Sequence, residues 1–246
     1  MVELPPPVRW WGHPLGETRV HLELAHLLLT ATWRGEDVPH GDGAPVLLVP
    51  GFLAGDLTLT VMHEWLRRIG YRSYRSGITW NVDCSEAAVR RLDRRLDRRL
   101  AAVADRTGAP VTLVGHSRGG LLARALAARR PELVRRVVGL GSPLGAQLDA
   151  SVLTLAAVGG ARLAQNLLRP HRPHCLTVRC PCPFGADLAR PATPPVVAIW
   201  SGQDGIVRPS ACRPEGAESR EVTGSHIGLG VNAQVYRHLA EVLARD

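Results

Sequence analysis

Short apolar runs alternate with longer amphipathic stretches along most of the chain. Four runs rich in Val, Leu and Ile predict strands: 46–49, 111–114, 134–140 and 196–200. The first is continuously apolar, as in a strand buried on both faces of a parallel sheet. Weaker strand patterns occur at 71–78 and 220–223. Between the strands, apolar residues recur at helical spacing over 56–69, 85–106, 118–129 and 231–244. This alternation predicts an α/β fold with a mostly parallel sheet of about six strands and helices on both faces.

Two segments depart from the alternation. Residues 1–44 form an N-terminal extension with a helix-like stretch at 18–33. Residues 145–195 separate two strands and join a helix-like run at 146–168 to a stretch rich in Pro and Cys. Such an excursion is either a lid over an apolar pocket or a set of ordinary helices packed on the sheet. No repeat or low-complexity linker divides the chain, so we expect one domain over 1–246.

The chain carries 30 basic and 22 acidic residues, a net charge of +8. An excess of positive charge suits proteins that bind nucleic acids or anionic surfaces. Here, however, every basic residue is Arg, the Arg residues are scattered, and no basic run is interleaved with aromatic residues as in a base-stacking surface. The densest basic stretch, 90–99, spaces Leu92 and Leu96 four apart, which predicts a helix with a solvated charged face. We therefore expect no nucleic-acid partner.

Membrane insertion is not expected either. The longest apolar run, 22–31, contains Glu23 and His26 and is far shorter than the ~20 residues that span a bilayer. The first residues lack the basic and apolar regions of a secretory signal, which predicts a cytoplasmic protein.

The cysteines leave the redox environment open. There are five, three of them crowded into one short stretch: Cys84, Cys175, Cys180, Cys182 and Cys212. One or two disulfides would indicate an exported protein, whereas free thiols would suit a cytoplasmic one. A metal site would add His171 and His174, although the cysteine spacing is not that of paired zinc ligands.

The strongest candidate chemistry lies in the pentapeptide Gly-His-Ser-Arg-Gly at 115–119. It follows a predicted buried strand directly and opens a predicted helix. A sharp strand-to-helix turn exposes the serine hydroxyl above the sheet edge, and the flanking glycines allow the strand and helix to approach closely. The sequence therefore predicts Ser117 as a nucleophile.

A serine hydroxyl needs a base to remove its proton and an acid to orient that base. Asp204 follows the strand at 196–200, and His226 lies just before the closing helix. Loops at the carboxyl ends of parallel strands converge on one edge of the sheet. Asp204 and His226 are therefore the predicted acid and base; Asp187 falls in the excursion and Asp149 too early in the chain.

The oxyanion of an acyl-transfer intermediate needs two hydrogen-bond donors. One is the backbone N–H of Arg118, at the start of a predicted helix. The second is expected from the loop at 49–55, where the N–H of Phe52 is the candidate and that of Leu53 the alternative. Leu53 and His116 are the predicted substrate-binding residues.

The chain resembles the α/β-hydrolase superfamily, and within it the small bacterial lipases and esterases. The matching stretches are PVLLVPGFLAG, VTLVGHSRGGLLARALA, VVGLGSPLG, IWSGQDGIV and VTGSHIGLG. The resemblance implies a serine nucleophile at Ser117, an acid at Asp204, a base at His226 and no cofactor or metal. Two positions differ from the common pattern: Pro50 replaces the frequent His of a His-Gly pair, and Arg118 replaces a small or apolar residue.

These features predict a serine hydrolase that cleaves small-molecule or lipid esters. An acyltransferase or thioesterase that uses the same three residues remains an alternative, because the acyl-enzyme would be shared. A ligand-binding protein that keeps the fold without catalysis is the alternative outside enzymes. The oligomeric state is left open.

Overall fold

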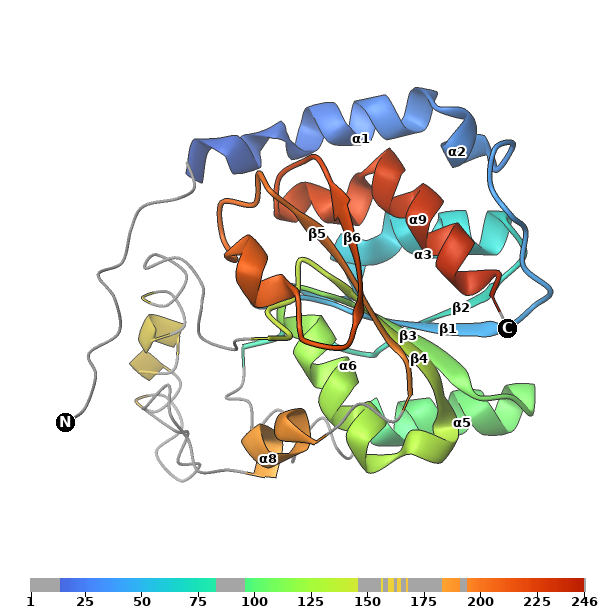
Figure 1. Ribbon diagram of the computed structural model, residues 1–246, viewed down its shortest axis with the longest axis vertical. Helices are drawn as coiled ribbons and strands as arrows, with labels where there is room; N and C mark the ends of the chain where they lie inside the picture. The colour runs from blue at the N-terminus through green and yellow to red at the C-terminus, as the bar shows by residue number, and fades with distance from the viewer. Residues whose placement is uncertain are drawn as a thin grey trace.

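The computed structural model describes residues 14–82, 96–145, 183–190 and 194–245, with isolated positions between 156 and 167. Within these residues, six strands form one sheet in which every neighbouring pair is parallel (Figure 1). In the order β2-β1-β3-β4-β5-β6 they are Arg72–Arg75, Pro45–Val49, Val111–His116, Val134–Leu140, Val196–Ser201 and Glu218–Val222. The predicted α/β fold and parallel sheet are therefore confirmed.

The register of the sheet brings the ends of its central strands together. Val49 of β1 pairs with Gly115 of β3, which in turn pairs with Gly139 of β4. These strands and β5 are almost wholly buried, in agreement with their content of Val, Leu and Ile. The loops after β1, β3, β4 and β5 therefore leave the sheet at one edge.

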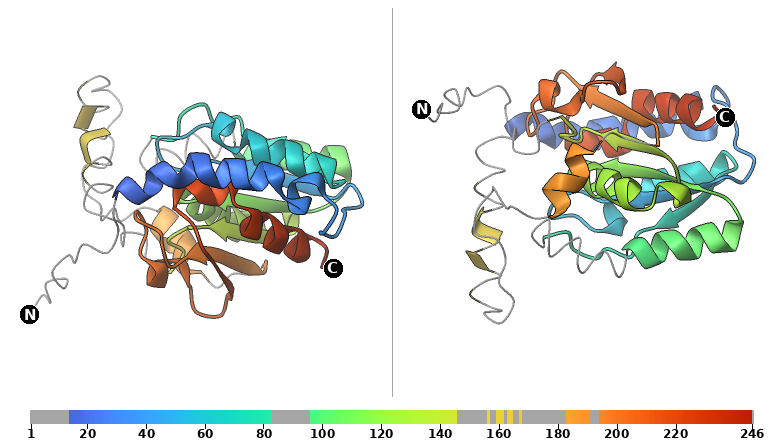
Figure 2. Two further views of the ribbon diagram at one scale, coloured as in Figure 1. Left: turned by 90° about the horizontal axis from the view of Figure 1, so that it is seen from above. Right: turned by 60° about the horizontal axis from the view of Figure 1, so that its bottom comes forward.

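Helices cover both faces of the sheet (Figures 1 and 2). One face is covered by α3 (Thr60–Arg68) and α9 (Ala233–Leu243), which share an apolar core with the sheet. The other face is covered by α5 (Arg98–Thr107), α6 (Arg118–Arg129) and α8 (Pro183–Ala189). The sheet is thus the middle layer of three.

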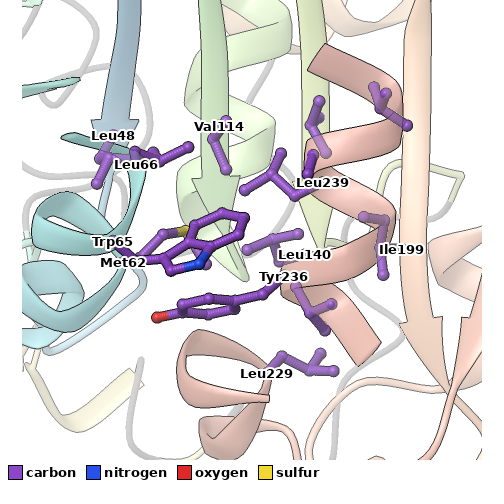
Figure 3. Packing of buried hydrophobic residues seen from close by; sticks show 14 of the residues in the cluster. Leu48, Met62, Trp65, Leu66, Val114, Leu140, Ile199, Leu229, Tyr236 and Leu239 are labelled. Atoms are coloured by element: carbon purple, nitrogen blue, oxygen red, sulfur yellow. The ribbon is translucent and has the colours of Figure 1, made fainter. Parts of the chain in front are cut away.

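The core beneath α3 and α9 centres on two aromatic side chains, Trp65 and Tyr236 (Figure 3). Their ring centroids lie 4.5 Å apart, and both side chains are fully buried. Trp65 Nε1 donates to the Thr32 carbonyl at 2.7 Å, and the Tyr236 hydroxyl donates to the Gly230 carbonyl at 2.9 Å. Because both polar tips have partners, the two rings can be buried without the cost of an unsatisfied donor.

The N-terminal helical segment lies outside α3 and α9, as a further layer (Figures 1 and 2). It consists of a 3₁₀ helix η1 (Pro14–Arg19), α1 (Val20–Leu29) and α2 (Ala31–Arg34). The helix-like stretch predicted at 18–33 is helical but divided into separate helices. The chain is extended at Thr30, whose Oγ1 accepts the Trp33 N–H at 3.2 Å and caps α2. A Thr side chain that satisfies a free helix donor favours such a break.

Other boundaries also differ from the sequence pattern. The predicted helix at 56–69 opens with a 3₁₀ turn, η2 (Asp56–Leu59), and the closing helix starts at Ala233 rather than at 231. Asn232 caps α9, its Oδ1 accepting two backbone N–H groups, so the preceding Ile227–Val231 forms a separate 3₁₀ helix, η6. β6 begins two residues early, at Glu218, because polar residues are tolerated on an edge strand.

Three predictions fall partly or wholly outside the described residues. The Arg-striped helix at 85–106 is described only from its last turns, as α5. Of the excursion at 145–195, α8 is described, and it packs Phe184 and Leu188 into the core below α6. The proposed lid at 146–168 lies outside the described residues except for isolated positions.

Candidate active site

Ser117 lies on a strained turn between the end of β3 and the start of α6. Its backbone has φ 53° and ψ −125°, in a region that L-residues rarely adopt. A Cβ on Gly115 would lie 2.3 Å from the Gly120 nitrogen, and one on Gly119 would lie 2.1 Å from the Val49 oxygen. Only glycine allows strand and helix to approach so closely, so the turn has the geometry that the pentapeptide predicts.

Asp204 and His226 form a buried hydrogen-bonded pair. Asp204 Oδ2 lies 2.6 Å from His226 Nδ1, and the two residues are 2% and 3% exposed. The other carboxylate oxygen accepts the N–H groups of Ile206 at 2.8 Å and Val207 at 2.7 Å. Because the carboxylate is fixed on both sides, it holds the imidazole with Nδ1 as the donor and leaves Nε2 for another partner.

The end of β4 lies between Ser117 and this pair. The Ser117 N–H donates to the Leu140 carbonyl at 2.7 Å. At the next residue, Gly141, a Cβ would lie 3.1 Å from His226 Nδ1 and 3.2 Å from Asp204 Oδ2. The loops after β3, β5 and β6 therefore bring the three predicted residues to one edge of the sheet.

His116, a predicted substrate-binding residue, lies next to the loop that carries His226. Its side chain is buried, and its Nε2 donates to the His226 carbonyl at 2.9 Å. The centroids of the two imidazole rings lie 5.1 Å apart. His116 therefore faces the backbone of the predicted base, and its role in substrate binding stays a prediction.

Burial, reinforced by the nearby His226, lowers the pKa of His116 from 6.5 to about 4. The folded protein therefore holds this residue neutral at pH values where the unfolded chain binds a proton. The contribution of neutral His116 to the free energy of unfolding is therefore complete above pH 6.5 and is lost as the pH falls through about 4.

We expect wild type to lose about 3 kcal/mol more unfolding free energy than His116→Gln between pH 7 and 4, as measured by urea denaturation. Equal losses in the two proteins would contradict this expectation.

The predicted oxyanion loop after β1 is held by Asn81, a residue that is 2% exposed. Asn81 Nδ2 donates to the Pro50 carbonyl at 2.9 Å, and the Asn81 N–H donates to the Ala54 carbonyl at 2.9 Å. The Leu53 N–H donates to the Asn81 carbonyl at 3.1 Å and so already has a hydrogen-bond partner. This leaves Phe52 as the candidate donor, while the side chain of Leu53, 45% exposed, remains a predicted substrate contact.

The side chain of Arg118 turns toward the same loop. Its Nη1 lies 2.9 Å from Asn81 Oδ1 and 3.3 Å from the Asn81 carbonyl oxygen. Its guanidinium carbon lies 5.8 Å from the centroid of the Phe52 ring, within reach of a cation–π contact. Arg118, which follows the predicted nucleophile, therefore joins the Ser117 turn to Asn81 and, through the Phe52 ring, to the predicted oxyanion loop.

Two buried polar residues of this region were not predicted from the sequence, Asn81 and Glu17. Asn81 lies in the loop after β2, and Glu17 lies in η1, far from any of the motifs. Neither stands at a spacing that marks a site, so only the contacts in the folded chain reveal them.

The choice between disulfides, free thiols and a metal site depends mainly on residues outside the described ones. Cys212, at the end of the 3₁₀ helix η5 (Pro209–Cys212), is buried, while the other four cysteines, His171 and His174 are not described. In the part of the chain that is described, no three His, Cys, Asp or Glu side chains gather as metal ligands. The described helices include none with the length and apolar character needed to cross a membrane.

Comparisons with known proteins point to one architecture. Residues 95–169 match the sequence model of the family described as the alpha/beta hydrolase fold. Curated protein sequences give no significant match to the chain.

Solved structures resemble the chain over most of its length. The lipase BlEst2 of Bacillus licheniformis, in its mature form, has a TM-score of 0.59 at 15% identity and covers 84% of this chain and 94% of its own. A soluble variant of monoglyceride lipase from Saccharomyces cerevisiae has a TM-score of 0.57 at 14% identity, over 84% and 89% of the two chains. A thioesterase domain from the curacin biosynthetic pathway has a TM-score of 0.50 at 18% identity, over 84% and 93%.

The family match and the structural likenesses agree with the parallel six-stranded sheet and show that the chain has the α/β-hydrolase fold.

Proposed function

We propose that the protein is a serine hydrolase that cleaves carboxylic esters through an acyl-enzyme on Ser117. The observation that carries the proposal is the strained turn at Ser117 on the same sheet edge as the buried Asp204–His226 pair. Strain of this kind persists only where the surrounding structure enforces it, and it concentrates at functional sites.

In the proposed reaction, His226 Nε2 takes the proton of the Ser117 hydroxyl as its oxygen attacks the ester carbonyl. The backbone N–H groups of Phe52 and Arg118 stabilise the resulting oxyanion. The alcohol leaves with the proton from His226, and a water molecule, activated by the same imidazole, then releases the acid. Asp204 keeps Nδ1 protonated and stabilises the imidazolium that forms at each step.

Apolar side chains next to the predicted machinery favour an apolar substrate group. Leu53 follows Phe52 and is 45% exposed, and Ile227 follows His226 and is 48% exposed. Burial of such side chains against an acyl or alcohol chain would contribute about 25 cal/mol per Å² of apolar surface. The lipase names of two structural relatives agree with a small-molecule or lipid ester as substrate.

Thioester cleavage or acyl transfer is the second candidate. The thioesterase domain among the structural relatives favours it, and the same acyl-enzyme would serve. Only the acceptor differs: water gives hydrolysis, whereas a bound alcohol or amine in a dry site gives transfer.

The experiment is a series of p-nitrophenyl esters from acetate to palmitate, with matched acyl thioesters and with Ser117→Ala as the control. We expect wild type to hydrolyse at least part of the ester series and the variant to hydrolyse none. Faster turnover of the thioesters would favour the second candidate. If wild type turned over neither series, the proposed hydrolase would be wrong, and a non-catalytic binding protein or an acyltransferase would be favoured.

A further inference from the structure

Two carboxylates of the N-terminal helical segment reach the loop that carries His226. Glu17 lies in η1 and is 9% exposed, and Glu23 lies in α1 with its side chain 11% exposed. Both are about two hundred residues away from His226 along the chain. Their oxygens accept hydrogen bonds from the consecutive backbone N–H groups of residues 225, 226 and 227.

Glu17 connects the loops of the predicted acid and base. Its Oε1 accepts the N–H of Gly205, the residue after Asp204, at 3.1 Å and the N–H of His226 at 3.2 Å. Its Oε2 accepts the N–H of Ile227 at 2.8 Å. One buried carboxylate thus fixes the backbone on both sides of the Asp204–His226 hydrogen bond.

Glu23 holds the residue before the base. Its Oε1 accepts the Ser225 N–H at 2.7 Å, and its Oε2 accepts the Ser225 hydroxyl at 2.7 Å. The Ser225 oxygen in turn accepts the Gly228 N–H at 3.1 Å, at the start of η6. Glu23 therefore supports the turn, while Glu17 is the residue that joins the two loops.

Anchoring of the N-terminal segment does not require Glu17. At its other end, the Thr32 carbonyl accepts from Trp65 Nε1. Just after α2, Asp37 Oδ2 accepts from Arg237 Nη2 at 2.8 Å. Leu27 is buried in the core shared with α3 and α9. A buried carboxylate is costly to desolvate, so an anchor alone would be served as well by an apolar side chain. Three backbone donors on one carboxylate instead indicate control of loop geometry.

We propose that Glu17 is a positioning residue that sets the geometry of the Asp204–His226 pair from the N-terminal segment. This inference rests on the proposed function, because the pair acts as base and acid only in that reaction. Small displacements of a catalytic group cost about a hundredfold in rate. Loss of Glu17 is therefore expected to lower kcat while leaving the acyl and alcohol contacts, and hence KM, little changed.

The test compares Glu17→Ala and Glu17→Gln with Asp37→Ala, which removes the contact with Arg237 just after α2. Readouts are thermal stability, kcat and KM on the best p-nitrophenyl ester, and the downfield proton resonance of the His226 Nδ1–H in NMR. We expect Glu17→Ala to lower kcat about a hundredfold and to shift or broaden the resonance. Glu17→Gln keeps one acceptor oxygen but places its amide NH₂ against the Ile227 N–H, which is also a donor. Its kcat should therefore lie between those of wild type and Glu17→Ala. Asp37→Ala should lower stability only.

The outcomes separate this inference from the proposed function. Wild-type kcat and an unchanged resonance in both folded Glu17 variants would overturn the positioning role and leave the hydrolase in place. The same kcat loss in Asp37→Ala would also overturn it, because general loosening would then explain the effect. If wild type cleaved no ester but Glu17→Ala alone lost the resonance, the positioning role would hold and the hydrolase would fail. Glu17→Gln, which preserves side-chain size, decides the matter if Glu17→Ala does not fold.

Discussion

Ser117→Ala is expected to lower kcat for the best ester by about 10⁶-fold while the protein stays folded. The side chain contributes the attacking oxygen, and no acyl-enzyme forms without it. Alanine has the same Cβ as serine and so meets the same strain at φ 53°. The loss should therefore appear in kcat and not in the thermal unfolding midpoint. Steady-state kinetics and thermal denaturation of the two proteins measure both quantities.

The control for this prediction is a serine that lies nearby without a proposed catalytic role. Ser142 is buried, and its hydroxyl donates to the Gly115 carbonyl at 3.1 Å. Ser142→Ala should lower stability and keep most of the activity. Substantial ester hydrolysis by Ser117→Ala, or an equal loss in Ser142→Ala, would remove Ser117 from the mechanism.

Asp204→Asn is expected to lower kcat by about 10⁴-fold with little change in fold. The N–H groups of Ile206 and Val207 hold the Oδ1 position, so the amide oxygen of the variant should remain there. Its NH₂ group then faces His226 Nδ1, which must become an acceptor. The imidazole would be held with its proton on Nε2, where it cannot accept the Ser117 proton. The kcat of the variant on the best ester measures this effect.

Asp187→Asn is the matched control for the acid. Asp187 is also buried, at 4% exposure, and its carboxylate pairs with Arg129 Nε at 2.6 Å, but it lies in α8 below α6. We expect this variant to lose stability and to keep its kcat. A fall in kcat for Asp187→Asn that matched that of Asp204→Asn would contradict the choice of acid.

The sheet could be predicted because its strands are buried on both faces. The short runs rich in Val, Leu and Ile that become β1, β3, β4 and β5 have few alternative interpretations. Edge strands and helix ends were less well predicted, since polar residues at β6 and caps such as Thr30 depend on local hydrogen bonds. A single side-chain oxygen can end a helix without altering its hydrophobic pattern.

The candidate site was predicted to the extent that its chemistry is local in sequence. The turn at Ser117 follows from its glycines, and the positions of Asp204 and His226 follow from parallel topology. The supporting contacts are long-range, as in the Glu17 and Asn81 hydrogen bonds, and no pattern of neighbouring residues encodes them. The contact of His116 was not predicted for the same reason, because its partner is a backbone carbonyl more than a hundred residues away.

The central claim is that Ser117 is a nucleophile activated by the buried His226–Asp204 pair. Incubation with a fluorophosphonate, followed by peptide mapping by mass spectrometry, tests it most directly. We expect one adduct, on Ser117, that forms more slowly in Asp204→Asn and not at all in Ser117→Ala. An unlabelled wild-type protein, or an adduct on another serine such as Ser142, would contradict it.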